Sequence, residues 1–251
     1  TEEERLLGVS LTGIMDAVVT SHPDPEVLSD LRQVAVDTNK EWAERLDIPQ
    51  SAAITCVKPS GTVSQLVDAA SGIHARHSPY YIRTVRGDVK DPLTQLMIDE
   101  GVPSEPEVHH PKLTTVFSFP VASPEYAVTR NDMTAMEQLE LWKAYAVGWC
   151  EHKPTVTISV RDDEWLEVGA WVYKNFDLCS GISFLPYSDH TYQQEPYQDC
   201  DEATYQELLD RMPTSIDWDR LGEYEAEDNT AGSQTLACVG GVCEIVDLNA
   251  A

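Results

Sequence analysis

The amino-acid sequence predicts an α/β protein, because apolar runs of strand length alternate along the chain with segments of helical periodicity. Residues 53–57 and 155–160 are short runs rich in β-branched residues, which are typical of strands. Residues 27–46 and 133–149 place apolar side chains three and four positions apart, which is typical of amphipathic helices. The alternation favours a parallel sheet or barrel over an all-helical or sandwich fold, and 42% hydrophobic content is sufficient for a core.

In the first part of the chain, residues 6–19 predict a strand or tight turn that leads into a helix. Pro25 is a suitable first residue for the amphipathic helix that follows, and we expect this helix to cover a sheet face with Trp42 in the core. The strand at 53–57 is predicted to end at Pro59, and residues 65–70 can continue as a helix.

Further along, the sequence predicts a helix, a strand, a helix, a strand, a helix and a short strand, at residues 92–100, 113–120, 133–149, 155–160, 165–175 and 181–185. Pro120 is expected to end the second of these elements. From residue 201 onward the chain has twelve acidic and two basic residues. We expect one helix before Trp218 and a polar linker over residues 223–234.

The overall charge of −26 and the pI of about 4.4 argue against nucleic acid as a partner. No apolar run approaches the ~18 residues that a membrane span needs, and residues 1–5 do not resemble the start of a secretion signal. Six cysteines are too few for a disulfide scaffold in a chain of 251 residues. We therefore expect a cytoplasmic protein with reduced thiols, among them a packed thiol at Cys150.

The loop after the strand at 53–57 is rich in hydroxyl groups and consists of Pro59, Ser60, Gly61, Thr62, Val63 and Ser64. Such a loop before a helix offers unpaired N–H groups and hydroxyls to a phosphate or carboxylate, although an ordinary capped turn has the same composition. Residues 56–90 carry five basic and two acidic side chains, which favours the anion site in an otherwise acidic protein.

Two further groups of residues are candidates for chemistry. His74 and His77 flank Arg76 and could contact a phosphate or a cofactor, or be merely solvated. Cys238 and Cys243 lie near the C-terminus on a glycine-containing segment, where a dithiol can exchange with other thiols. Structural thiols remain an alternative for this pair, and a zinc site would need two further ligands that do not follow in the sequence.

Residues 54–66, ITCVKPSGTVSQL, and residues 71–83, SGIHARHSPYYIR, closely resemble the monomeric, adenosylcobalamin-dependent ribonucleoside-triphosphate reductases, the class II ribonucleotide reductases. The resemblance covers nearly the whole chain but only the C-terminal part of such an enzyme. It implies that residues 1–222 form the C-terminal half of a ten-stranded α/β barrel, and that residues 223–251 form an acidic linker and a flexible, redox-active tail.

By the same resemblance, residues 59–64 bind the substrate phosphates, and adenosylcobalamin initiates thiyl-radical reduction of a ribonucleoside triphosphate. Cys238 and Cys243 re-reduce the active site with a thioredoxin-like reductant. The residues that could face the cofactor are His74, Arg76, His77 and Tyr80. The family's Asn-Pro-Cys radical motif is absent from this sequence, so the resemblance implies an N-terminal partner that carries it. The alternative is a non-catalytic nucleotide-binding or regulatory module, for which the cysteine pair would have no use.

Overall fold

The structure is a computed structural model that describes residues 5–187 and 193–225. Its described residues form two compact units. The first comprises Thr1–Ile82, Pro120–Tyr192 and Tyr197–Tyr205, and the second comprises Arg83–Phe119, Gln193–Pro196 and Gln206–Ala251, in each case as far as the residues are described. The boundary between the units falls within two strands, β3 (Tyr80–Asp88) and β5 (Thr114–Ala122).

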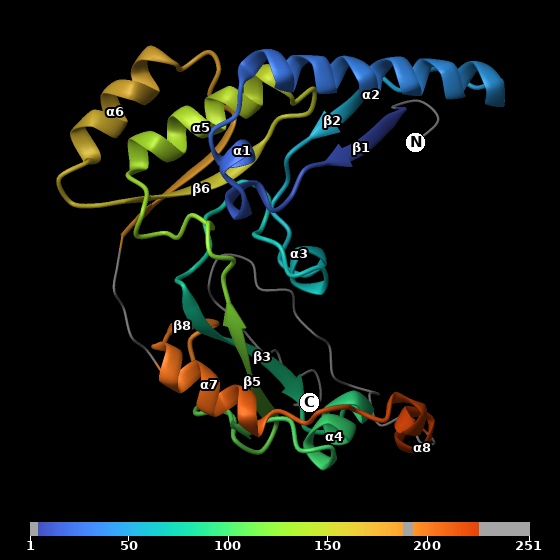
Figure 1. The fold of residues 1–251 in the computed structure, drawn as a ribbon, viewed down its shortest axis with the longest axis vertical. Coiled ribbons are helices and arrows are strands. Elements are labelled where there is room, and N and C mark those ends of the chain that lie inside the picture. Colours follow the sequence, from blue (N-terminus) through green and yellow to red (C-terminus); the bar gives the residue numbers. More distant parts are fainter. Residues whose placement is uncertain (1–4, 188–192, 226–251) are drawn as a thin grey trace, which may run out of the picture. The chain divides into compact units, whose positions relative to one another are not determined.

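The first unit contains two parallel strand pairs, which confirms the predicted α/β class (Figure 1). Strand β1 (Leu6–Ser10) pairs with β2 (Ala53–Cys56), and β6 (Thr155–Val160) pairs with β7 (Gly181–Pro186). The long helices of this unit are α2 (Pro25–Leu46), α5 (Ala135–Gly148) and α6 (Trp165–Lys174). All of these helices and strands except β1 were predicted at nearly the same bounds, and β1 was predicted as a strand or turn.

A third sheet has the strand order β4-β5-β3-β8, in which β4 and β5 are antiparallel. The strands not yet given are β4 (Ser104–Pro106) and β8 (Tyr197–Asp199). The remaining helical elements are η1 (Ile14–Asp16), α1 (Val18–Ser21), α3 (Val63–Leu66), α4 (Pro92–Asp99), α7 (Glu202–Arg211), η2 (Trp218–Arg220) and α8 (Leu221–Tyr224). No described helix is both long and apolar enough to cross a membrane.

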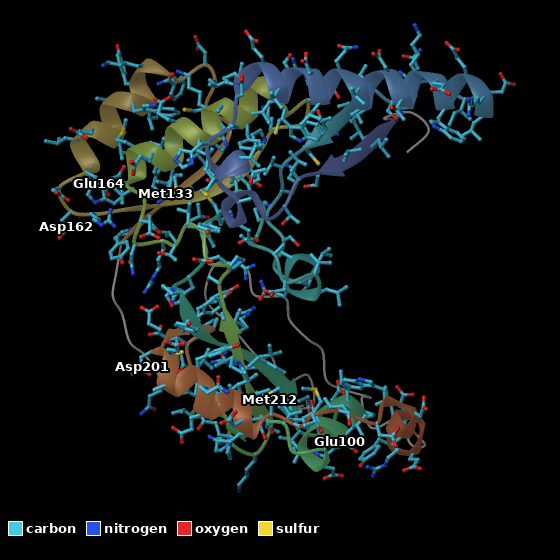
Figure 2. The ribbon with its side chains drawn as sticks, viewed as in Figure 1. Glu100, Met133, Asp162, Glu164, Asp201 and Met212 are labelled. Atoms are coloured by element: carbon cyan, nitrogen blue, oxygen red, sulfur yellow. The ribbon has the colours of Figure 1, made fainter. Side chains whose placement is uncertain are left out.

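Helix α5 begins at a capping box. The Thr134 hydroxyl accepts a hydrogen bond from the backbone N–H of Glu137, and the Glu137 carboxylate accepts one from the backbone N–H of Thr134. The backbone N–H of Ala135 also donates to Oε1 of Glu164 over 2.9 Å. Figure 2 shows Glu164 and Met133 on neighbouring segments where the loop before α6 approaches the start of α5. The Nη1 of Arg161 donates to the Met133 carbonyl over 3.3 Å, so two polar contacts fix how α5 enters the core.

The core of the first unit lies among α5, α6 and the strand β6, and its largest fully buried side chains include Trp142, Tyr145 and Ile158. The indole of Trp142 meets that of Trp171 on α6 edge to face, with ring centroids 6.4 Å apart. Trp171 also donates its indole N–H to Glu140 over 2.6 Å. These contacts pack α5 and α6 against each other.

Helix α2 differs from the prediction, because most of its apolar side chains are exposed. Of its apolar residues only Leu28 and Ala43 are buried, whereas Trp42 is 51% exposed and Val34 62% exposed. The five residues of β1 are exposed as well. The expected core position of Trp42 is therefore wrong for this chain. Periodicity identifies the apolar face of a helix but not what covers it.

Other boundaries also differ from the prediction. Helix α3 has a single turn and ends before Asp68, which adopts a left-handed backbone conformation with φ of 48°. Strand β5 continues past Pro120 to Ala122, because β4 pairs with it only as far as Phe117 and a residue without an N–H is tolerated beyond that point. Strand β3 was not predicted. The ten-stranded barrel stays a prediction.

Candidate functional site

The loop at residues 59–64 is closed by hydrogen bonds between its own serines. The backbone N–H of Ser64 donates to Oγ of Ser60 over 2.9 Å, and the Ser64 hydroxyl donates to the Ser60 carbonyl. The Ser60 N–H donates to Oγ of Ser71 over 2.8 Å. Two of the N–H groups predicted to bind an anion are therefore engaged within the protein. The exposed residues of the loop are Pro59, which has no N–H to offer, and residues 61–63.

Gly72 is required for the packing of this loop. Its φ is 58°, and an added Cβ would lie 2.6 Å from the carbonyl oxygen of Lys58. The Gly72 N–H donates to Oγ1 of Thr12 over 2.9 Å, which joins the loop to the start of the chain. Gly61, by contrast, has nothing within 4 Å of an added Cβ. Gly72 is therefore a structural glycine, whereas Gly61 borders open space.

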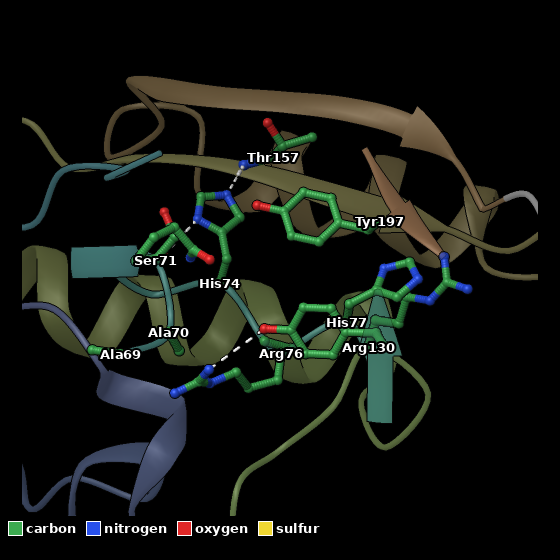
Figure 3. A pocket seen from close by; sticks show the side chains of 12 residues that line it. Ala69, Ala70, Ser71, His74, Arg76, His77, Arg130, Thr157 and Tyr197 are labelled. Carbon is green, nitrogen blue, oxygen red and sulfur yellow. Dashed lines mark hydrogen bonds between the residues drawn. The ribbon is translucent and has the colours of Figure 1, made fainter. Parts of the chain in front are cut away.

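A pocket of about 340 Å³ lies in the first unit, next to the segment 69–77 (Figure 3). The polar and aromatic side chains that line it include Ser71, His74, Arg76, His77, Tyr81, Arg130 and Tyr197. Three predicted site residues, His74, Arg76 and His77, thus line a single pocket. Residues 59–64 do not line it, although Ser60 is bonded to Ser71.

Arg76 is 3% exposed, and each of its five N–H donors has an acceptor within the protein. Nε and Nη2 donate to the two carboxylate oxygens of Asp16 over 2.7 and 3.2 Å. Nη1 donates to the Asp68 carboxylate and the Tyr81 hydroxyl, and Nη2 also donates to the Asp68 carbonyl. Arg76 therefore joins three chain segments and keeps no donor for a ligand.

His74 has a fixed neutral tautomer. The backbone N–H of Thr157 on β6 can only donate, and it lies 3.1 Å from Nε2 of His74. The Ser71 carbonyl can only accept, and it lies 3.0 Å from Nδ1. Nδ1 therefore carries the proton. Burial lowers the pKa of His74, and the bond to Ser71 opposes this effect.

His77 lies at the opposite side of the pocket from His74 in Figure 3, beside Arg130. Its Nε2 is 3.1 Å from Oδ1 of Asp199, and Oδ2 of the same carboxylate accepts from Nη2 of Arg130 over 2.8 Å. The imidazole stacks on Tyr197, with ring centroids 5.5 Å apart, and is tilted against Tyr81 at 5.7 Å. One carboxylate thus holds a ring and a guanidinium group at an aromatic wall.

Tyr80 does not line this pocket. Successive residues of a strand point to opposite faces, and Tyr81 is the one that faces the pocket. The Tyr80 ring instead packs 5.1 Å from that of Tyr205 on α7. The charge of Glu202 raises the pKa of Tyr80, together with its partial burial. The predicted contact of Tyr80 with a cofactor therefore stays a prediction, and Tyr81 is the tyrosine of this pair that lines the pocket.

Sequence reasoning also missed Arg130, Tyr197 and Asp199, because they are remote in the chain. A parallel bridge between Arg76 and Thr129 places Arg130 next to the segment 74–77. The Arg76 N–H donates to the Val128 carbonyl over 3.0 Å, and the Arg130 N–H donates to the Arg76 carbonyl over 2.8 Å. No spacing in the sequence signals this contact, since tertiary pairing creates it.

The structure describes Cys150 but not the cysteine pair near the C-terminus. Cys238 and Cys243 lie outside the described residues, so their predicted shuttle role stays a prediction. Cys150 is buried at the end of α5, and its burial raises the pKa of its thiol to about 12. A thiol with such a pKa is protonated and unreactive near neutral pH, which agrees with the packed thiol that we expected.

Comparison with known proteins gives a consistent result. The adenosylcobalamin-dependent ribonucleoside-triphosphate reductase of Euglena gracilis is 31% identical over 217 residues, which cover 84% of this chain and 30% of that protein. The protein of the same name from Lactobacillus leichmannii is 25% identical over 97% of this chain and 37% of its own length. No protein-family model matches the chain.

The fold agrees with these sequence matches. A crystal structure of a B12-dependent (class II) ribonucleotide reductase superposes on 89% of this chain with a TM-score of 0.75, at 22% sequence identity, and the match covers 35% of that reductase. The chain spans about a third of the length of the relatives named above. Over most of its own length it is therefore related to part of the adenosylcobalamin-dependent ribonucleoside-triphosphate reductases, which is the resemblance that its motifs predicted.

Proposed function

We propose that this chain is the C-terminal part of an adenosylcobalamin-dependent reductase that converts ribonucleoside triphosphates to 2′-deoxyribonucleoside triphosphates. The observation that carries the proposal is the extent of the similarity, since reductases of one name align with 84–97% of the chain. A protein that had kept only a nucleotide-binding loop would resemble them over a much shorter stretch.

In this reaction the 2′-hydroxyl of the ribose leaves as water, and two cysteine thiols are oxidised to a disulfide. The exposed residues 61–63 are the part of the loop that remains open to the substrate phosphates. The serine bonds described above hold the loop closed behind them, so a nucleotide would meet a preformed turn rather than order it on binding.

We infer that the pocket takes part of the cofactor. Its volume of about 340 Å³ is near the lower limit of ligand pockets and suits a nucleoside-sized group rather than a whole corrin. His77, Tyr81 and Tyr197 supply aromatic surface for such a group. Adenosylcobalamin supplies, when bound, the radical that starts the reaction. His74 and Arg76 are held by internal hydrogen bonds, so they keep the pocket in shape. The chain's own contribution is therefore to bind this group of the cofactor and to orient it.

The exposed apolar residues of α2 and β1 support a partner chain or segment. Leu6, Val34 and Leu46 are each at least 60% exposed, and Trp42 is 51% exposed. Apolar surface of this kind marks an interface in a soluble protein. We propose that the N-terminal part of the reductase, which carries the radical cysteine, covers it.

Cys238 and Cys243 complete the proposal as the dithiol that returns the active site to its reduced form. Thiol–disulfide exchange passes two electrons through a mixed disulfide, so the pair must react both with the oxidised active site and with an external thioredoxin-like reductant. The acidic linker before the pair is long and polar enough to give it reach.

Turnover measurements test the function. The chain combined with its N-terminal part should convert a ribonucleoside triphosphate to the deoxy product in the presence of adenosylcobalamin and a dithiol. The chain alone should show nucleotide or cofactor binding at most. Turnover by the chain alone would contradict the proposed division of labour, and absence of turnover in the combination would favour a binding module.

A further inference from the structure

The two arginines that line the pocket differ in how many of their donors are engaged. Arg76 uses all five of its N–H groups within the protein, as shown above. Arg130 makes one side-chain hydrogen bond to the described residues, from Nη2 to Asp199 over 2.8 Å. Arg130 is thus the arginine of this pocket with donors available to a ligand.

The surroundings of Arg130 support this assignment. Its Nε is buried and has no hydrogen-bond partner among the described residues, so any donor offered to a ligand comes from the Nη atoms. The side chain is 29% exposed, and its guanidinium group lies 5.9 Å from the centre of the Tyr187 ring. Asp199 fixes one edge of the guanidinium group while binding His77 with its other oxygen. No described residue accepts from Nη1, which leaves this group for a second acceptor.

The charges around the pocket indicate what kind of acceptor this is. Arg76 and Arg130 carry two positive charges, and the carboxylates of Asp16, Asp68 and Asp199 that contact them carry three negative charges. Even with a proton on His77 this group would have three positive and three negative charges, so it has no excess positive charge. A phosphate would therefore gain little here, whereas an uncharged oxygen or nitrogen acceptor needs no compensating charge.

We propose that Arg130, held by Asp199, is the residue through which this pocket binds the uncharged nucleoside part of its ligand, and that Arg76 only supports the pocket. The ligand class follows from the pocket volume, the aromatic wall of His77 and Tyr197, and the balance of charge. The inference rests on the proposed function for the choice of an adenosyl group as the nucleoside.

The chain offers a matched control for Arg130. Arg161 lies 4.9 Å from the same Tyr187 ring but is not among the residues that line the pocket. Arg130→Gln and Arg161→Gln each remove one positive charge and one contact with Tyr187. Only the first removes donors from the pocket, so the comparison separates ligand binding from packing against Tyr187.

The experiment measures the dissociation constants of 5′-deoxyadenosine and adenosylcobalamin by equilibrium dialysis with the complete protein. Arg130→Gln should weaken both about tenfold or more, because a hydrogen bond from a charged donor is lost. Arg130→Lys should restore part of the loss, because it keeps the charge but not the fork of donors. Arg161→Gln should bind as the unchanged protein does, and inorganic phosphate should not compete.

Four results would overturn the inference: unchanged binding by Arg130→Gln, equal weakening by Arg161→Gln, competition by phosphate, or no binding of either probe to the unchanged protein. Binding and turnover are measured separately. If the complete protein turns over but its binding of the two probes does not depend on Arg130, this inference alone is refuted. If binding of the probes depends on Arg130 but the protein does not turn over, the proposed function alone is refuted.

Discussion

The backbone N–H of Thr157 donates to Nε2 of His74 over 3.1 Å, and this single contact sets the protonation state of the imidazole. A protonated His74 would present a second N–H to Thr157 instead of an acceptor. The bond between β6 and the pocket segment therefore requires neutral His74. Burial of the ring acts in the same direction by lowering its pKa.

Acid should weaken the fold through His74. Because its pKa in the folded state is lowered below 6.5, the unfolded chain binds more protons between that lowered value and 6.5. Stability should therefore fall as the pH falls through this window, and His74→Gln should reduce the slope because glutamine does not titrate. Thermal unfolding between pH 5 and pH 8, in the protein assembled with the rest of the reductase, measures it. An unchanged slope in the variant would contradict the prediction.

Arg76→Met should strongly destabilise the fold. It leaves the carboxylate of Asp16, whose side chain is 17% exposed, without its partner, and removal of one member of a buried ion pair costs about 3–5 kcal/mol. Arg45→Met is the control, since Arg45 pairs with Glu41 at the surface and such pairs contribute less than about 1 kcal/mol. Denaturant unfolding compares the two variants, and similar effects would show that Arg76 is not structural.

Gly61→Val should impair nucleotide binding without affecting the fold. A Cβ at Gly61 meets no atom within 4 Å, so only an incoming nucleotide would be obstructed, and we expect a loss of a few kcal/mol, about a hundredfold in affinity. Gly72→Ala should instead lower the melting temperature, because its Cβ would lie 2.6 Å from a backbone oxygen. Calorimetric titration with a nucleoside triphosphate decides, and undiminished affinity in Gly61→Val would exclude the loop as the phosphate site.

Trp42→Ser should weaken association with the N-terminal part of the reductase while leaving the stability of this chain nearly unchanged. Trp42 is 51% exposed, so its removal opens no cavity in this chain, and large aromatic side chains dominate many interfaces. Lys40→Ser, an exposed polar position on the same helix, is the control. A pull-down titration of the two parts measures the effect. If both variants associate equally well, α2 is not the interface.

Cys238→Ser and Cys243→Ser should nearly abolish turnover driven by a thioredoxin-like protein in the complete enzyme. They should largely spare turnover driven by a small dithiol, which can reach the active site directly and bypass a shuttle. Steady-state rates with the two reductants measure the difference. Equal loss with both reductants would indicate that the pair is structural.

Local information was sufficient for several elements. The helices α2 and α5 and the strand β6 follow from periodicity, because each pattern extends over enough residues to exclude the alternative period. Strand β2 follows from its apolar, β-branched composition and the proline after it. The motif at 54–66 also identified the relatives, and the polar residues at 74–77 identified a segment that lines the pocket. These properties depend on neighbours in the chain.

The rest was decided by tertiary contacts. Arg76 and Arg130 have the same side chain, yet one is saturated by Asp16, Asp68 and Tyr81, and the other donates a single hydrogen bond from its side chain to the described residues. The bridge between Arg76 and Thr129 that brings Arg130 to the pocket joins residues more than fifty positions apart. The role of a charged side chain depends on which partners surround it in space, and sequence spacing carries no record of those partners.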